Sequence, residues 1–344
     1  MTRKIARIVK LDDVMTHTNA DSLDLAIVGG WQVVVKRGEY KPGDLAIFVE
    51  IDGFVPETIA PFLTKNYPRE YNGVLGNRLR TIKLRGELSQ GLILPMQTLN
   101  DVTGNSVSIY EVDEDVSEIL NIQKWEMPEQ MVNGQPRGNF PDWIQKTDQE
   151  RIQNLSGKIH QWNEKELQWI AQEKLEGSSM TVYVRGEESG VCSKNIDLKY
   201  DENNTFWKTA IKYNVIEKIR QIYSDKDEVA IQGELIGPGI QGNIYNLNEH
   251  EFHVFDMQVN GYFLSESIVE CMCEEMGLYV VPYLGKISFN NAKDCLDYAE
   301  GKSVLNPKVE REGVVVRCRS IPTLTFKAIS NKYLLKEKEE ACSI

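Results

Sequence analysis

The sequence predicts an α+β protein in which a small β-barrel precedes a larger domain of antiparallel sheets flanked by helices. Three observations predict this class. Short apolar runs separated by glycine and proline fill the first hundred residues, mixed strand and helix periodicities follow from about residue 168, and an acidic segment lies between them. With 344 residues and 41% hydrophobic side chains, the chain can form about two domains with real cores. We therefore expect domains at residues 1–100 and 146–344, joined by a linker at 101–145.

The first hundred residues are expected to hold short strands. These cover residues 5–11, 23–28, 32–35, 45–49, 79–84 and 91–94. Evenly spaced short strands with turn residues between them are typical of a closed barrel. Side chains alternate along a strand, so Arg78 and Arg80 are expected on one face and Lys83 and Arg85 on the other. These cations either form a solvated face or contact phosphates, and the sequence leaves both readings open.

The linker is set apart by its charge. Residues 1–100 contain 13 Lys and Arg against 11 Asp and Glu, a net charge of +2. Residues 101–150 contain 3 against 11, a net charge of −8. The remaining residues contain 23 against 29, a net charge of −6, and the three segments add up to −12. A basic face elsewhere can still hold phosphates despite the acidic total. Residues 112–122 have helical spacing, and residues 146–155 predict a second helix with Thr147 as N-cap and Glu150 as its capping-box partner.

The remaining elements alternate between strands and helices. Strands are expected at residues 169–174, 181–184, 229–235, 251–259 and 313–317, and helices at 209–222, 265–276 and 292–300. No apolar run approaches the roughly 18 residues of a membrane span, and no charged-then-apolar leader opens the chain. The six cysteines form no Cys-x-x-Cys pair, so neither a zinc site nor a disulfide framework is indicated. We expect an intracellular, cytoplasmic protein without a membrane partner.

The most informative motif is Lys174-Leu175-Glu176-Gly177. A lysine with glycine three places on is common, and Lys83 also has one, but only Lys174 is followed by an ordered series of charged clusters. The series consists of Ser193-Lys194-Asn195, Gly233-Glu234-Leu235, residues 252–256 around Phe255, Glu312-Gly313, and Phe326-Lys327.

This series resembles the covalent nucleotidyltransferases, which comprise DNA and RNA ligases and mRNA capping enzymes, over residues 136–336. A Lys-Thr-Asp and Arg-Ile-Gln-Asn run upstream of Lys174 and turn sequences at residues 19–23, 38–44 and 89–92 are similar to ATP-dependent RNA ligases of the Naegleria and Deinococcus type, whose OB-fold domain is N-terminal. The resemblance implies an OB-fold barrel followed by a nucleotidyltransferase (ATP-grasp-like ligase) domain. Only 17 residues follow Lys327, too few for the C-terminal OB domain of capping enzymes and most DNA ligases.

The resemblance implies that Lys174 attacks the α-phosphate of ATP and carries AMP as a phosphoramidate. The attacking amine must be neutral, and we expect neighbouring cations and partial burial to favour that form. Lys194 and Lys327 are expected to hold phosphates, and Lys327 to take part in catalysis. Many relatives have arginine where Lys194 stands, and Thr325 stands where some RNA ligases have a second lysine.

The three motif glutamates are expected to place a metal ion and the ribose. Glu176, Glu234 and Glu312 supply the oxygen ligands that Mg²⁺ or Mn²⁺ accepts, directly or through water. Gly177 completes the nucleotide-binding motif. Phe255 lies in an apolar strand, where core packing is the default, whereas the resemblance implies that it stacks on adenine.

The resemblance as a whole implies an ATP-dependent RNA ligase, and we expect it to be a monomer. Its expected substrate is nicked duplex RNA with 3'-hydroxyl and 5'-phosphate ends, and its expected role is RNA repair. Two alternatives stay open: a non-catalytic OB-fold RNA-binding protein, and, within the superfamily, a DNA ligase.

Overall fold

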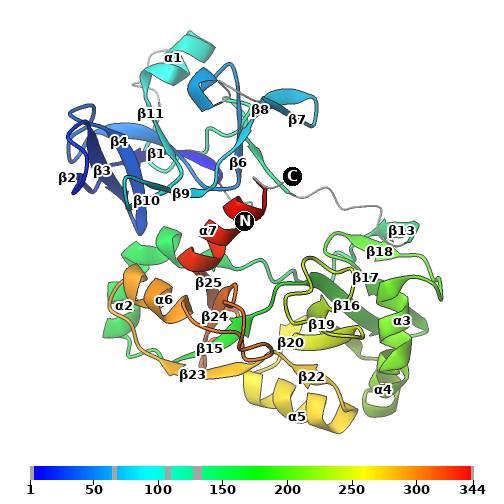
Figure 1. Ribbon diagram of the computed structural model, residues 1–344. Helices are drawn as coiled ribbons and strands as arrows, with labels where there is room; N and C mark the ends of the chain where they lie inside the picture. Colours follow the sequence, from blue (N-terminus) through cyan, green and yellow to red (C-terminus); the bar gives the residue numbers. More distant parts are fainter. Residues whose placement is uncertain (1–3, 64–67, 105–109, 127–133, 342–344) are drawn as a thin grey trace. The chain divides into compact units, whose positions relative to one another are not determined.

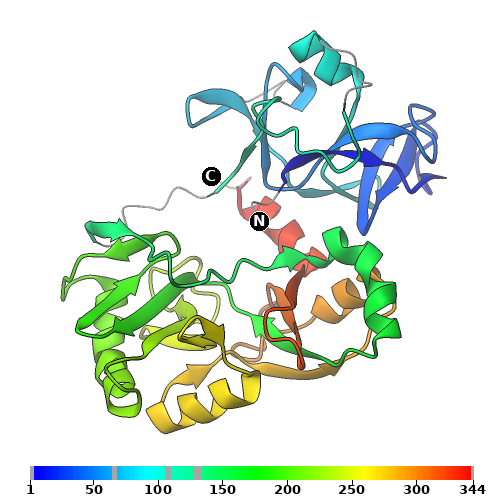
Figure 2. The same ribbon diagram turned by 180° about the vertical axis from the view of Figure 1, so that it is seen from behind.

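The computed structural model describes residues 4–63, 68–104, 110–126 and 134–341. It divides into two compact units (Figures 1 and 2). The first unit comprises residues 1–129 together with two returning segments, 153–157 and 334–344, and the second comprises residues 130–152 and 158–333. None of the helices in these described ranges is long and apolar enough to span a bilayer.

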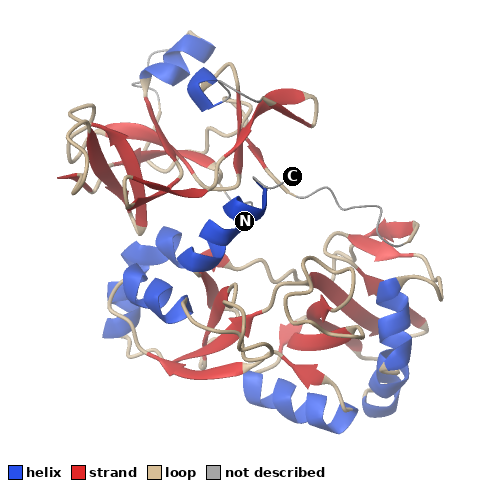
Figure 3. Cartoon of the chain, in the orientation of Figure 1, coloured by secondary structure: helices blue, strands red, loops and turns tan. Residues whose placement is uncertain are grey.

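The first unit is built almost entirely from short antiparallel strands (Figure 3). Three ladders are β1-β5-β11, β2-β3-β4 and β12-β6-β8-β7, and β9 pairs with β10. The strands are β1 (Ala6–Lys10), β2 (Asp13–Thr16), β3 (Leu23–Val28), β4 (Trp31–Lys36), β5 (Leu45–Val49), β6 (Gly53–Pro56), β7 (Arg69–Tyr71), β8 (Val74–Arg78), β9 (Thr81–Leu84), β10 (Glu87–Gln90), β11 (Leu92–Pro95) and β12 (Gln123–Lys124). A 3₁₀ turn (Pro61–Leu63) and helix α1 (Gln97–Thr103) complete the unit, whose core includes Trp31 and Phe48.

Residues 153–157 belong to the first unit although they lie far along the chain. Asn154 is the centre of this insertion. Its Oδ1 accepts hydrogen bonds from Trp31 Nε1 at 2.6 Å and Arg7 Nη2 at 3.2 Å, and its Nδ2 donates to Glu50 Oε1 at 2.6 Å. Because the Glu50 side chain is fully buried, this amide satisfies a carboxylate that water does not reach.

The second unit contains two sheets. One has the order β13-β18-β17-β16-β19-β20-β21, with β22 also on β20, and the other has the order β14-β25-β24-β15-β23. Their strands are β13 (Pro136–Asn139), β14 (Glu150–Arg151), β15 (Trp169–Lys174), β16 (Ser178–Arg185), β17 (Glu188–Cys192), β18 (Ile196–Leu198), β19 (Glu228–Ile236), β20 (Glu251–Val259), β21 (Tyr262–Phe263), β22 (Tyr279–Val280), β23 (Tyr283–Ile287), β24 (Gly313–Cys318) and β25 (Thr325–Ile329).

Helices cover one face of each sheet. The helices of this unit are α2 (Ile159–Glu164), α3 (Thr205–Lys212), α4 (Val215–Ile222), α5 (Glu266–Met276) and α6 (Ala292–Ala299), and η3 (Ile152–Lys158) and α7 (Asn331–Ala341) cross into the first unit. Helices α3, α4 and α5 pack on the sheet that contains β16 and β19, whereas α2 and α6 lie beside β24 and β25 (Figure 1). The opposite faces of both sheets carry the polar side chains of the site.

Three expected local features are wrong. Residues 112–122 form turns instead of a helix, because Asp113 has a φ of 69° and its carboxylate pairs with Lys4. Thr147 caps no helix, since Glu150 and Arg151 form β14 alongside β25 and 3₁₀ geometry follows. The predicted helix at residues 209–222 is two helices, separated at Asn214 with a φ of 52°.

Candidate active site

The five-stranded sheet gathers cations from three strands on one face. In the register of this sheet, Gln172 of β15 lies opposite Val315 of β24. Val315 in turn lies opposite Lys327 of β25. On the other side of β25, Lys327 lies opposite Arg151 of β14. Opposed residues of neighbouring strands share a face, and so do residues two apart on one strand. Lys174, Lys327 and Arg151 therefore point to the same side of the sheet.

Lys174 is held by carboxylates. Its Nζ lies 2.7 Å from Glu312 Oε1, and the two side chains are 26% and 16% exposed. Burial lowers the pKa of Lys174, but the Glu312 and Glu234 carboxylates raise it by more, so that the pKa lies above its ordinary value. The expectation that neighbouring cations and partial burial favour the neutral amine is therefore wrong, because the two carboxylates outweigh both effects. Arg151 does oppose its protonation, but more weakly.

The charge of Glu234, which lies on β19 of the other sheet, acts on the same amine. Burial raises the pKa of Glu234 to about 8, with Glu312 adding to the shift and Lys174 and Lys194 opposing it. The turn after Lys174 lies tightly against this strand. A Cβ atom at Gly177 would come within 2.6 Å of the Leu235 carbonyl oxygen and 2.7 Å of Glu234 Cγ. Glycine at this position thus allows the Lys-x-x-Gly turn to approach Glu234.

Glu176 is oriented through both carboxylate oxygens. Oε2 accepts a hydrogen bond from the Tyr333 hydroxyl at 2.6 Å, and Oε1 accepts one from the Gly242 amide at 3.3 Å. The backbone amide of Glu176 also donates to the Tyr245 hydroxyl at 2.6 Å. Burial raises the pKa of Glu176, the hydrogen bond from Tyr333 lowers it, and nearby Glu312 raises it, with a net upward shift.

The glutamates are coupled to one another, but they do not form a ready metal cage. The described ranges contain no group of three or more His, Cys, Asp or Glu side chains placed to hold a metal ion. Glu312 nevertheless raises the pKa of both Glu176 and Glu234, so the three carboxylates act on one small region. Such oxygen donors fit a hard divalent cation that keeps several of its waters.

Lys194 lies in the exposed loop between β17 and β18, from which its charge acts on Glu234. Neighbouring Asn195 fixes that loop: its Oδ1 accepts from Lys146 Nζ at 2.9 Å, and its carbonyl oxygen accepts from the Phe140 amide at 3.0 Å.

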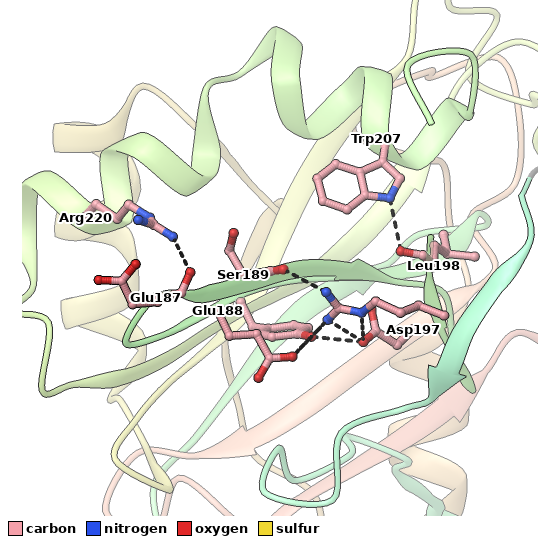
Figure 4. A network of polar contacts seen from close by, with 9 residues as sticks. Glu187, Glu188, Ser189, Asp197, Leu198, Trp207 and Arg220 are labelled. Atoms are coloured by element: carbon pink, nitrogen blue, oxygen red, sulfur yellow. Dashed lines mark hydrogen bonds and ion pairs between the residues drawn. The ribbon is translucent and has the colours of Figure 1, made fainter. Parts of the chain in front are cut away.

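A second polar network braces the same hairpin. Asp197 Oδ2 accepts from Arg137 Nη2 at 2.6 Å and from the Tyr183 hydroxyl at 2.9 Å (Figure 4). Arg137 also donates to the Ser189 carbonyl oxygen at 3.2 Å. These bonds link β13 with the hairpin of β17 and β18, which carries Lys194.

Phe255 occupies a β-bulge. Gln232 pairs with Asp256 and Gly233 with Val254, so Phe255 has no partner in the ladder and its direction is released from strict alternation. The half-buried ring packs on the apolar cluster that includes Leu175. The expected core packing of Phe255 is therefore observed, and its stacking on adenine stays a prediction.

The ring of Phe255 also lines a cavity of about 80 Å³. A buried ion pair contributes to its wall. Arg317 Nη1 and Nη2 donate to the two Asp256 oxygens at 2.8 and 3.0 Å, and Arg317 Nε donates to Gln172 Oε1 at 2.7 Å. Since Asp256 belongs to one sheet and Arg317 to the other, this pair fixes the two polar faces against each other.

Two residues of the site, Arg151 and Tyr333, were not predicted from the sequence motifs. Arg151 is 95% buried beside Lys327, and its only signal in the sequence was the Arg-Ile-Gln-Asn run. Tyr333 carried no signal at all, because an isolated tyrosine gives no hint of a carboxylate partner 157 residues away.

The basic stretch of the first unit needs a correction. Arg78 ends β8, and its Nη2 lies 2.6 Å from Asp52 Oδ1 while its guanidinium covers Trp125 at 3.9 Å. Asp52 thus balances the charge of Arg78, and a phosphate contact by this residue stays a prediction. Arg80 is half-buried between strands, Lys83 is exposed in β9, and Arg85 has a φ of 52° in the turn before β10. The expected alternation on a single strand is therefore wrong.

Comparisons with known proteins agree with this geometry. A sequence profile of the RNA ligase family matches residues 167–334, and an OB-fold domain profile matches residues 5–96. The structure of Naegleria gruberi RNA ligase with PPi superposes with a TM-score of 0.89 at 37% identity, covering 98% of this chain and all of that one. Variants of the same ligase with AMP and Mn and with ATP and Mn superpose equally well at 36% identity, over the same shares of both chains. No curated protein matches.

Proposed function

Since this chain belongs to the RNA ligase family, we propose that it is an ATP-dependent RNA ligase that seals 3'-hydroxyl and 5'-phosphate ends through AMP carried on Lys174. The observation that carries the proposal is the placement of the Lys174 amine, 2.7 Å from Glu312 and within the field of Glu234, on a face shared with Arg151 and Lys327.

In the first step, Lys174 Nζ attacks the α-phosphorus of ATP. A P–N bond forms, the P–O bond to the β-phosphate breaks, and pyrophosphate leaves with the bonding electrons. The amine loses a proton in this step, and Glu312 Oε1 lies at hydrogen-bonding distance to receive it. Negative charge that develops on the phosphates faces the cations of Arg151 and Lys327, and Lys194 acts from its loop.

The carboxylates that raise the pKa of Lys174 also explain a need for a divalent cation. A bound Mg²⁺ or Mn²⁺ ion would neutralise carboxylate charge and polarise a phosphate oxygen. Glu312, Glu234 and Glu176 would hold it, mostly through water. Once their charge is balanced, the attraction that keeps Lys174 protonated weakens, and the burial of the amine then favours its neutral form.

In the later steps the AMP passes to the polynucleotide. The 5'-phosphate attacks the lysine-bound AMP, which breaks the P–N bond, and the 3'-hydroxyl then attacks the activated end and releases AMP. The proposed substrate is a nicked RNA duplex, and sealing the nick repairs the broken strand. The OB-fold unit supplies a fold that binds oligonucleotides on a strand face.

The test is transfer of radioactive AMP from ATP to the protein. We expect the label to stay on the protein through denaturing electrophoresis, because it is covalently bound, and we expect no label on Lys174→Ala. Label that persists in Lys174→Ala would remove this lysine from its role. Absence of label with any nucleotide would favour the alternative of an OB-fold RNA-binding protein. Sealing assays with RNA or DNA on each side of a nick separate the RNA ligase from the DNA ligase.

Two further expectations stay predictions. The protein is expected to be a monomer, which sedimentation of the full chain tests. It is expected to be cytoplasmic, which fractionation of cells tests. Neither affects the chemistry proposed for Lys174.

A further inference from the structure

Tyr333 contacts the nucleotide site from the far end of the second unit's sequence. It lies in the first turn of α7, directly after the strand that carries Lys327. Its half-buried side chain places the hydroxyl 2.6 Å from Glu176 Oε2. A short, charge-assisted hydrogen bond of this kind is stronger than one between neutral groups.

The first turn of α7 is fixed from several directions. Glu300 Oε1 accepts hydrogen bonds from the amides of Asn331 at 2.8 Å and Lys332 at 3.3 Å, and therefore caps the helix. The amide of Tyr333 donates to Ser330 Oγ at 3.1 Å, while the amide of Ser330 donates to the carbonyl oxygen of Glu312 at 2.9 Å. The position of the Tyr333 ring is thereby tied to the backbone that carries Glu312.

Glu176 would be less constrained without this contact. Its other carboxylate oxygen has a longer hydrogen bond of 3.3 Å from the Gly242 amide. Because the torsion that turns a glutamate carboxylate is broad, one long bond defines its plane poorly. The hydroxyl of Tyr333 supplies the second point that fixes the plane.

We propose that Tyr333 is a positioning residue, which holds the Glu176 carboxylate in the orientation used when ATP binds. This inference rests on the proposed function of the Lys174 site. Tyr333 acts through Glu176, so its contribution should vanish when the carboxylate is removed. A residue that only stabilises the fold would instead weaken ATP binding to the same extent whether or not Glu176 is present.

The experiment is a double-mutant cycle on the full-length protein. ATP binding is measured by calorimetry in the Lys174→Ala background, which cannot take up AMP. Four proteins are compared: the background itself, the background with Tyr333→Phe, with Glu176→Ala, and with both. Tyr298→Phe is the matched control, because it removes a tyrosine hydroxyl that donates to the Leu284 carbonyl oxygen at 3.0 Å in the same unit.

We expect Tyr333→Phe to weaken ATP binding about tenfold, the scale of one hydrogen bond to a charged group. The protein with both changes should bind no more weakly than Glu176→Ala alone, and Tyr298→Phe should leave the dissociation constant unchanged. Additive losses in the double variant, or no loss from Tyr333→Phe, would overturn the inference.

A second measurement uses the protein with Lys174 intact. Tyr333→Phe should raise the KM for ATP in lysyl-AMP formation and leave the rate at saturating ATP within about twofold of the unaltered protein, as expected for a group that improves binding alike in ground and transition states. A loss confined to the maximal rate would contradict the proposal. If the unaltered protein takes up no AMP label, the proposed function fails and the inference fails with it. If the unaltered protein is labelled but the KM of Tyr333→Phe is unchanged, only the role of Tyr333 is overturned.

Discussion

His253 shows, at the scale of one residue, how burial and charge compete for the pKa of a side chain. The ring lies inside β20, is 97% buried, and stacks on Tyr279 with the ring centres 5.0 Å apart. Its Nε2 is 2.8 Å from Glu251 Oε2. Burial lowers the pKa of His253, and the bond to Glu251 offsets only part of that shift. The folded protein therefore favours the neutral ring.

A pH dependence of stability follows from this direction. With a pKa of about 6.5 in the unfolded chain and a lower one in the folded protein, the unfolded state binds more protons as the pH falls. The neutral ring therefore contributes to the free energy of unfolding at a pH above the pKa of the unfolded chain. This contribution is lost as the pH falls from that pKa toward the lower pKa of the folded protein. The change His253→Gln should remove this contribution, so that Tm falls less between pH 7 and pH 5 than in the unaltered protein.

Calorimetric melting of both proteins across this pH range provides the measurement. His160→Gln is the control, because the side chain of His160 is 87% exposed on α2. Parallel pH profiles for the unaltered protein and His253→Gln would contradict the prediction.

Gly177 matters at the scale of elements, because it lets the turn between β15 and β16 lie against β19. A methyl group there would meet the Leu235 carbonyl oxygen of β19 at 2.6 Å, and β19 cannot yield without disturbing its ladder with β16. We expect Gly177→Ala to cost about 1–3 kcal/mol of unfolding free energy, the usual range for overpacking. Lysyl-AMP formation should fall at least tenfold, because the Lys174 turn moves away from Glu234.

Urea denaturation and the AMP label report these two effects. Gly138→Ala is the matched control, since a Cβ atom at Gly138 meets nothing within 4 Å in an exposed part of β13. Normal stability together with a normal label for Gly177→Ala would show that the close approach to β19 is unimportant.

The elements that the sequence predicts well are those with a long apolar pattern. Strands β15, β19, β20 and β24 lie within a residue or two of their expected bounds, because buried strands need continuous apolar runs. The predicted secondary structure was wrong where contacts with residues far along the chain determine it. Parallel pairing with β25 draws Glu150 and Arg151 into a sheet, against a local capping pattern that favours a helix.

The candidate site divides along the same line. Lys174, Glu234 and Glu312 follow from motif order, and the structure gathers them. No pattern along the chain could reveal that Asp52 neutralises Arg78, or that Tyr333 holds Glu176, since both depend on tertiary contacts.

At the scale of the whole molecule, binding of nucleic acid and chemistry on ATP should be separable. Lys83 and Arg85 are exposed in the first unit, whereas Lys174 lies in the second. We expect the double change Lys83→Gln and Arg85→Gln to weaken binding of nicked RNA and to lower the salt slope by about 1 for each lost phosphate contact. Uptake of AMP in the absence of RNA should be unchanged.

Nick affinity measured from low to high salt tests this separation. Arg78→Gln provides the contrast, because loss of its pair with Asp52 and its contact with Trp125 should lower Tm instead of the salt slope. Unchanged nick affinity in the double variant would identify the hairpin of β9 and β10 as a solvated surface.

The insertion of Asn154 has a consequence for the order in which the protein is made. A ribosome that has released only residues 1–129 has produced every strand of the first unit, yet Glu50 still lacks the amide that reaches it 104 positions later. Because residues 153–157 and 334–344 both belong to this unit, the barrel reaches its final state only when nearly the whole chain has emerged. A gene fragment cut at the apparent end of the barrel would therefore lack the Asn154 side chain that bonds to Glu50 and Trp31, and it should be less stable than the barrel within the full chain.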